Sequence, residues 1–278
     1  MRAYRHFNLL SLDVAAGAVV SAAFFARVLN VSILPQGLAL LGIIVWLIYT
    51  ADHLLDAWSM RQAATSERHR FHQENFITIL LVFLIAGVVA LGLMFVIRVQ
   101  LITTGIVFGT FVVVYLLVNR WLKYFKELTG SVLYTGGVLL PSWSVHTQPL
   151  SNHQMMYIAI FGLIVFTNML IFARFSIEED ILNRQKSIAT VMGIRAMGTL
   201  ITVVAAACFL VMIYQATKGF SFDLVVLFVM ELILVLIFAF RYFRYNDRYR
   251  LYGDAIFLLP AVLFIIPAHP AAVALSLP

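Results

Sequence analysis

The stretch Ile48–Trp58, with the sequence IYTADHLLDAW, closes a long apolar run with two carboxylates, Asp52 and Asp56. Residues four positions apart share one face of a helix, so the two acids would point the same way. A charged side chain in a membrane span is costly and often marks a functional site. Neighbouring carboxylates also suit Mg²⁺, which prefers oxygen ligands. The same pair could instead end the span in interfacial water, and the stretch alone leaves both interpretations open.

The composition around this stretch is that of an integral membrane protein. The chain has 278 residues, of which 63% are hydrophobic and 12% charged, and its mean hydropathy is +0.97. These values are typical of many transmembrane helices and exclude an ordinary soluble domain. The single cysteine, Cys208, excludes a disulfide framework and a cysteine metal site. Without a strong repeat or a linker, residues 1–278 are predicted to form one domain.

Apolar runs of about the length of a hydrocarbon core recur along the whole chain. Their approximate bounds are 9–31, 37–58, 76–97, 101–118, 128–145, 154–172, 194–215, 222–240 and 251–268. The first run follows Arg2 and Arg5, as a signal peptide would, but it is long enough to be a retained helix. We therefore expect an all-α, polytopic helical bundle with about nine transmembrane helices.

The basic residues divide unevenly between the two sides of this predicted topology. Sixteen of the nineteen Lys and Arg residues fall on one side, and only Arg27, Arg98 and Lys218 fall on the other. Positive charge marks the cytoplasmic side, so we predict a cytoplasmic N-terminus and an outside C-terminus, in a bacterial inner membrane. The net charge of +6 then reflects topology and attraction to anionic lipid, and it requires no nucleic acid.

A second acidic segment, Glu178, Glu179 and Asp180, follows the sixth run. The second and sixth runs cross in the same direction, so both acidic segments should emerge on the cytoplasmic side. Basic residues lie in the loops around them: Arg61, Arg68, Lys123, Lys126, Arg184 and Lys186. Carboxylates that hold magnesium, beside cations that bind phosphate oxygens, suit a magnesium–diphosphate group. A solvated network of interfacial charges would give the same pattern.

Two segments, ADHLLDAW (51–58) and SIEEDILNRQKSIATVMG (176–193), resemble the two aspartate-rich motifs of the UbiA superfamily of intramembrane prenyltransferases. Asp52 and Asp56 match the last two aspartates of the first motif, and Asp180 matches the closing aspartate of the second. Further matches are the acids Glu178 and Glu179, the downstream Lys186, Ser187 and Gly193, and the basic segment NRWLKYFKELTG (119–130). Ile48, Tyr49 and Ser176 depart from the family, because they stand where its motifs have Asn, Asp and Asp.

The resemblance implies nine transmembrane helices and a cytoplasmic-facing site that moves an isoprenoid group from a prenyl diphosphate to an aromatic or other lipophilic acceptor. It implies catalytic roles for Asp52, Asp56 and Asp180, and a Mg²⁺ site formed by Asp52, Asp56, Glu179 and Asp180. The diphosphate would be bound by Arg61, Arg68, Lys123, Lys126, Arg184 and Lys186. Membrane lipid would surround the bundle.

Other residues keep alternatives open. The departures from the motifs would also fit a non-catalytic membrane scaffold or assembly factor. Glu231, near the middle of the eighth run, would fit an ion-coupled transporter. His53, His69 and His72 lack the spacing of a zinc site and are expected to be polar interface residues. Asp254 opens the ninth run and could belong to the polar end of the site.

Overall fold

The computed structural model describes residues 2–59, 67–118, 121–122, 125–182 and 187–265, and within these ranges it contains helices and no strand. The all-α prediction is therefore confirmed for this part of the chain. The helices are α1 (Arg2–Leu9), α2 (Leu12–Val28), α3 (Pro35–Ser59), α4 (Glu67–Glu74), α5 (Phe76–Met94), α6 (Val99–Val118), α7 (Lys126–Trp143), α8 (Asn152–Phe175), α9 (Ile177–Leu182), α10 (Ile188–Met192), α11 (Ile194–Lys218), α12 (Phe222–Ala239), η2 (Arg241–Asp247), α13 (Arg248–Ala255), η3 (Ile256–Ala261) and α14 (Val262–Ile265).

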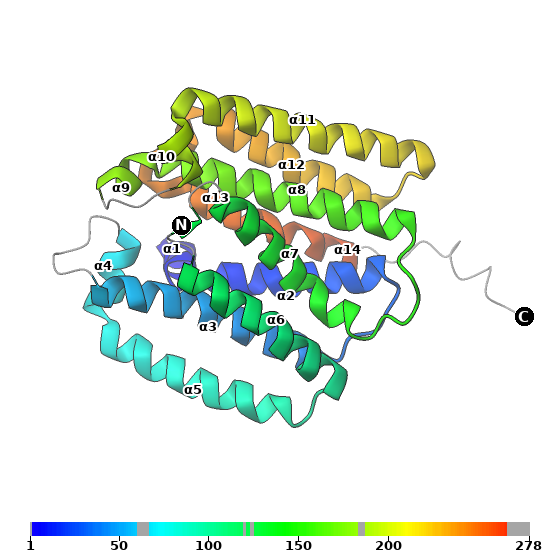
Figure 1. Cartoon of the computed structure of the whole chain (residues 1–278), viewed down its shortest axis with the longest axis horizontal. Coiled ribbons are helices and arrows are strands. Elements are labelled where there is room, and N and C mark those ends of the chain that lie inside the picture. The colour runs from blue at the N-terminus through cyan, green and yellow to red at the C-terminus, as the bar shows by residue number, and fades with distance from the viewer. Residues whose placement is uncertain (1, 60–66, 119–120, 123–124, 183–186, 266–278) are drawn as a thin grey trace, which may run out of the picture.

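Helix α8 forms the centre of the packed core. It contacts α7 on one side and α11 and α12 on the other, as Figure 1 shows. Its buried side chains form a wide stripe, as expected of a helix packed against several neighbours; the fully buried ones include Ile160, Phe161, Ile164 and Leu170. Helix α8 therefore contacts other helices along most of its length.

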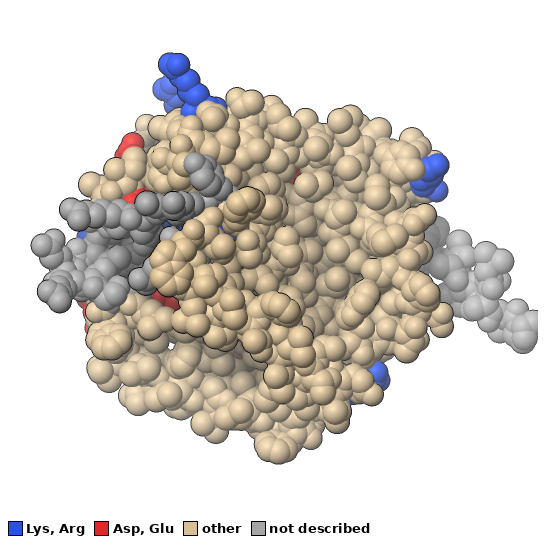
Figure 2. All heavy atoms as spheres, viewed as in Figure 1, with Lys and Arg blue, Asp and Glu red and all other residues tan. Residues whose placement is uncertain are grey.

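Helices α5 and α6 lie at the edge of the bundle and leave most of their apolar side chains uncovered. In α5 only Ile79 and Ala90 are buried, and α6 has no buried residue. On the face shown in Figure 2, most Lys, Arg, Asp and Glu atoms gather toward two opposite ends, and a broad belt between them carries few. A wide apolar belt is typical of a surface that faces lipid.

Within the described part of the chain, six helices are long and apolar enough to cross a membrane: α3, α5, α6, α8, α11 and α12. This supports an integral membrane protein, but it does not confirm the predicted count of about nine spans. The other three apolar runs do not qualify, each for a different reason. Helix α2 has only 17 residues. In α7, small and polar residues lower the mean hydropathy; they include Gly130, Ser131 and Thr135, and Pro141 lies in the same helix. The last run is divided among α13, η3 and α14, with Pro260 inside η3. Proline lacks a backbone N–H and interrupts regular helical hydrogen bonding.

The two ends of the bundle carry different parts of the chain. Helices α1, α4, α9 and α10 lie at one end, to the left in Figure 1, and α14 lies toward the other. At the latter end, Nε of Arg27 on α2 donates to Oδ1 of Asp223 on α12 at 2.8 Å. Arg27 is one of the three cations that the charge analysis separated from the rest. Which end faces the cytoplasm remains a prediction.

Candidate active site

The first acidic segment belongs to the last two turns of α3. The helix continues unbroken to Ser59, so Asp52 and Asp56 lie one turn apart along the same side of its backbone. Asp52 is half-buried. The side chain of Asp56 lies outside the described part of the structure, although its backbone is helical. Uninterrupted α-helix is what the spacing of the two acids required.

Tyr115 connects the end of α6 to the start of α7 and approaches the acids of both α3 and α7. Its hydroxyl donates to the backbone carbonyl of Lys126 at 3.3 Å. The same hydroxyl lies within electrostatic range of the carboxylates of Glu127 and Asp52. Two acids that are far apart in the sequence thus act electrostatically on one phenol group.

Glu127, in the first turn of α7, is a carboxylate that the sequence analysis did not single out. It is only 7% exposed, and its Oε1 accepts a hydrogen bond from the backbone N–H of Ile188, the first residue of α10, at 3.3 Å. Its Oε2 is buried and has no hydrogen-bond partner among the residues that the structure describes. Burial raises the pKa of Glu127; the Ile188 hydrogen bond and Lys126 oppose this shift, and Asp180 adds to it. One feature of the sequence indicated Glu127: it directly follows Lys126 in the basic segment.

The second acidic segment forms the short helix α9. Asp180 is half-buried and Glu178 is exposed, and Asp180 lies within electrostatic range of Glu127. We call Asp52, Glu127 and Asp180 the acidic cluster. It joins the end of α3, the start of α7 and α9 at the end of the bundle that is on the left in Figure 1.

Ser176, which replaces an aspartate of the second family motif, does not contribute to this cluster. It is buried, and its hydroxyl donates to the carbonyl of Phe172, one turn earlier, at 2.8 Å. A serine hydroxyl bonded back to its own helix is satisfied locally. The acid that is missing at this position is therefore not replaced there.

Most of the predicted diphosphate-binding cations cannot be placed. The cations outside the described residues are Arg61, Lys123, Arg184 and Lys186. The side chain of Arg68 in α4 is also outside the description, as is that of the predicted metal ligand Glu179 in α9. Lys126 is described: it is half-buried at the start of α7 and lowers the pKa of the neighbouring Glu127. One of the six predicted cations is thus seen at the acidic cluster.

A second polar cluster lies inside the bundle between α1, α2 and α13. The side-chain amide of Asn8 donates to Asp13 and, at 3.2 Å, to Oδ2 of Asp254. Asp13 is completely buried and Asp254 nearly so. Asp254 was expected at the polar end of the site, but Asp13 was missed, although a carboxylate near the start of an apolar run was the available signal. The shared amide ties three segments from both ends of the chain together.

The remaining polar side chains singled out from the sequence are packed between helices. The buried rings of His53 on α3 and His72 on α4 lie 4.9 Å apart, centroid to centroid, so these histidines join two helices. Glu231 on α12 is fully buried, and its Oε1 accepts a hydrogen bond from Thr167 on α8 at 3.0 Å. An interhelical hydrogen bond thus satisfies one oxygen of this carboxyl group, while its Oε2 has no hydrogen-bond partner among the described residues.

The donor chemistry of the acidic cluster fits magnesium, because carboxylate oxygens are its preferred protein ligands. Within the described residues no group of three or more His, Cys, Asp or Glu residues lies close enough to hold one metal ion. Two of the four predicted ligands, Asp56 and Glu179, have side chains outside that description. Among the described residues, the buried side-chain oxygens without a hydrogen-bond partner include Oε2 of Glu127 at this cluster and Oε2 of Glu231 in the interior.

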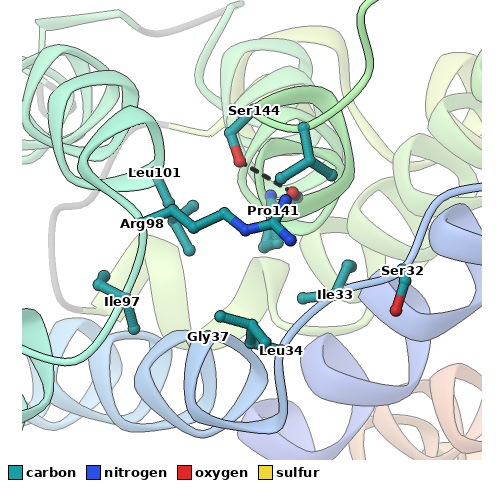
Figure 3. Close-up of a pocket in the computed structure, with 10 residues that line it drawn as sticks. Ser32, Ile33, Leu34, Gly37, Ile97, Arg98, Leu101, Pro141 and Ser144 are labelled. Atoms are coloured by element: carbon teal, nitrogen blue, oxygen red, sulfur yellow. Dashed lines mark hydrogen bonds between the residues drawn. The ribbon is translucent and has the colours of Figure 1, made fainter.

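A small pocket lies at the opposite end of the bundle, where α2 joins α3 and α5 joins α6. Figure 3 shows Arg98 reaching into it toward Pro141, near the hydroxyl of Ser144, which donates to the carbonyl of Pro141 at 2.9 Å. The rest of the lining is mainly apolar and includes Ile33, Leu34 and Leu101. With one cation and no carboxylate, this pocket lacks the groups that a magnesium–diphosphate requires.

Comparison with known proteins finds proteins that are similar in structure but none that matches in sequence. No family model and no curated protein matches the sequence. The apo structure of a UbiA homologue from Aeropyrum pernix K1 superposes with a TM-score of 0.65 at 12% identity, covering 91% of this chain and 98% of that one. A UbiA homologue from Archaeoglobus fulgidus, bound to GPP and Mg²⁺, superposes with a TM-score of 0.64 at 10% identity, covering 94% and 99%. The resemblance found in the two acidic segments is thus confirmed at the level of the fold: this chain has the fold of the UbiA homologues over nearly its whole length.

Proposed function

We propose that this chain is a divergent member of the UbiA superfamily and a magnesium-dependent prenyltransferase. It would move an isoprenoid group from a prenyl diphosphate to an aromatic or other lipophilic acceptor. The observation that carries the proposal is the acidic cluster, in which Asp52 and Asp180, from the two motif-like segments, both approach elements around Glu127. The fold shared with a homologue that binds GPP and Mg²⁺ supports the same assignment.

The proposed chemistry is the ionisation of an allylic diphosphate, whose departing pyrophosphate carries several negative charges. Asp52, Asp56, Glu179 and Asp180 would hold magnesium, which supplies neutralising positive charge when it is bound. The basic side chains would bind the phosphate oxygens from the cytoplasmic side; they are Arg61, Arg68, Lys123, Lys126, Arg184 and Lys186. Charge stabilisation of this kind acts on the leaving group in the transition state.

The allylic cation that remains needs shelter from water until the acceptor attacks it. The half-buried ring of Tyr115 lies at the acidic cluster, and the half-buried ring of Tyr134 packs 5.3 Å from that of Phe257 in the interior. Aromatic faces stabilise cations, and the apolar edge formed by α5 and α6 would admit an isoprenoid chain from the lipid.

A non-catalytic scaffold is the second candidate function, and the local bonding of Ser176 favours it. Its hydroxyl is used within α8, so the position supplies no metal ligand. A protein that kept the fold and lost turnover would show this kind of departure. Activity measurements separate the two functions.

The test is to incubate the purified, detergent-solubilised protein with prenyl diphosphates of different lengths and Mg²⁺, and to follow pyrophosphate release with and without candidate acceptors. An enzyme releases pyrophosphate only when magnesium is present. Asp52→Asn is expected to lower the rate about 100-fold or more, because it weakens a contact that is strongest in the transition state. The control is Asp223→Asn, which removes the negative charge paired with Arg27 at the other end of the bundle. Folded wild-type protein without turnover would favour the scaffold.

A further inference from the structure

The chain leaves the long apolar helix α12 through a short stretch that is dense in arginine and aromatic residues. Residues 241–250 have the sequence RYFRYNDRYR, with four arginines, three tyrosines, one phenylalanine and a single acid, Asp247. They form η2 and the first turn of α13, and we call them the arginine segment. Helix α12 begins beside Asp223 at the opposite end of the bundle, so the segment lies at the end that carries α9 and α10 (Figure 1).

Most of the arginine segment is open to the surroundings of the protein. No residue of η2 is buried, and Arg241, Tyr242, Arg244 and Tyr245 are all exposed. Residues 246 and 247 have left-handed backbone conformations, with φ values of 53° and 52°; they are Asn and Asp, which adopt this conformation more readily than most residues. The chain therefore turns back into α13, and the exposed side chains stay at the end of the bundle.

The arginines of this segment stack on aromatic rings and are not balanced by acids. Cζ of Arg248 lies 4.1 Å from the centroid of the Tyr242 ring, and Cζ of Arg244 lies 5.2 Å from that of Phe175 at the end of α8. Arg241, Arg244 and Arg248 form no ion pair in the part of the chain that the structure describes. A guanidinium group that stacks on a ring still has N–H donors at its edge. The segment thus presents positive charge together with hydrogen-bond donors.

The position and chemistry of the segment favour phospholipid head groups as its partner. It directly follows a helix long enough to cross the membrane, which places it near the level where hydrocarbon gives way to head groups. Tyrosine is enriched at that level, and clustered arginines next to a span attract anionic lipid. The planar guanidinium group can bind two phosphate oxygens at once. The ring of Phe240, 57% exposed, favours a partner that also has apolar chains.

We propose that the arginine segment binds the phosphate groups of anionic phospholipids through Arg241, Arg244 and Arg248. This goes beyond the proposed prenyltransferase function and does not depend on it. It also differs from the general attraction of a basic protein face to a membrane, in which every exposed cation counts alike. Arg244 rests on Phe175, the last residue of α8, so bound lipid would also stabilise the end of α8 that leads into α9.

The experiment is native mass spectrometry of the detergent-solubilised protein, titrated with dioleoyl phosphatidylglycerol, a lipid with one negative charge. It gives the Kd of the first bound lipid. Arg241→Gln is expected to raise this Kd about 10-fold, because it removes charge-assisted hydrogen bonds to phosphate. The matched control is Arg195→Gln, which removes another exposed arginine at the same end of the bundle, in the first turn of α11. Its Kd should equal that of the wild type.

Three further probes identify the chemical group that is bound. Dioleoylglycerol has the same chains without a phosphate, and dioleoyl phosphatidylcholine adds a cation that the arginines would repel. Both should bind the wild-type protein more weakly than phosphatidylglycerol does. Inorganic phosphate lacks the chains and should not displace phosphatidylglycerol; displacement would assign the segment to free phosphate and overturn the lipid proposal.

Two other results would also overturn it. Equal effects of Arg241→Gln and Arg195→Gln would mean that the lipid responds to total charge and not to this segment. Equal affinities of the wild-type protein for phosphatidylglycerol and phosphatidylcholine would exclude recognition of an anionic head group. Circular dichroism and size-exclusion chromatography show whether each variant is folded. Prenyl transfer is tested separately through Asp52→Asn, so either proposal can fail while the other stands.

Discussion

Gly253 on α13 packs tightly against α8, and its replacement gives a sharp test of this packing. A Cβ atom at this position would lie 2.5 Å from Oδ1 of Asn168 and 2.6 and 2.9 Å from two ring atoms of Phe172. Asn168 is buried, and the Phe172 ring packs edge-on against Tyr249, with 5.6 Å between the centroids. Neither side chain can move aside without disturbing its own neighbours.

We expect Gly253→Ala to destabilise the protein by about 2 kcal/mol. Overpacking costs about 1–3 kcal/mol, and three contacts shorter than 3 Å place this site in the upper part of that range. The better helix propensity of alanine returns up to about 1 kcal/mol. Gly87→Ala is the control: Gly87 lies in α5, and a Cβ there would meet no atom within 4 Å. That variant should equal the wild type or gain up to about 1 kcal/mol.

The assay is unfolding in mixed micelles of mild detergent and SDS, followed by circular dichroism. The measured quantity is the free energy of unfolding of each variant relative to wild type. Equal stability of Gly253→Ala and Gly87→Ala would refute the packing of α13 against α8, and with it the placement of the neighbouring Asp254 in the interior cluster.

Three further predictions concern single polar groups. Ser176→Asp should be tolerated and should lower the half-saturating Mg²⁺ concentration for pyrophosphate release, because it restores an acid beside α9; an unchanged concentration would mean that the site is formed without this position. In metal-free protein, the raised pKa of Glu127 means that the folded state holds its proton more tightly than the unfolded state. The unfolding free energy should therefore fall as the pH rises from about 4.5 through the higher folded-state pKa; Glu127→Gln should remove this part of the pH profile, and an unaltered profile would contradict the burial of that carboxyl group. Thr167→Val should cost about 1–3 kcal/mol by leaving Glu231 without its hydrogen bond, and Thr167→Val combined with Glu231→Leu should recover much of the loss; no loss in the single variant would exclude the interhelical bond.

The fold class followed from the sequence because hydrophobic composition and run length depend only on local residues. The apolar runs of α5, α6 and α12 became long helices with nearly the expected bounds. The count of spans was harder to predict, because hydropathy does not show where a run will break. Pro260 and the short 3₁₀ segment around it divide the last run, and α2 ends at Val28, before the run ends.

The sequence allowed two predictions about the candidate site: which ends of the helices share one side of the membrane, from the direction in which each run crosses, and which acids share one helix face, from their spacing. The crossing directions of the second and sixth apolar runs predicted that the end of α3 and α9 lie on the same side, and both lie at the same end of the bundle in Figure 1. The roles of Asp52 and Asp180 at a shared site stay a prediction. Glu127 and Asp13 were missed because their roles depend on tertiary contacts: one accepts a hydrogen bond from Ile188, 61 residues away, and the other is joined through Asn8 to Asp254, 246 residues from that asparagine. Neither contact has a local sequence pattern.

The most direct test of the central claim is the location of the metal and the diphosphate in a crystal of this protein grown with geranyl diphosphate and Mn²⁺. Anomalous scattering from Mn²⁺ identifies the ions independently of the protein density. The account predicts Mn²⁺ peaks between α3 and α9, with carboxylate oxygens of Asp52 and Asp180 at about 2 Å, the distance of a direct metal–oxygen bond. Ions and diphosphate bound elsewhere, for example beside Arg98 at the opposite end of the bundle, would contradict it.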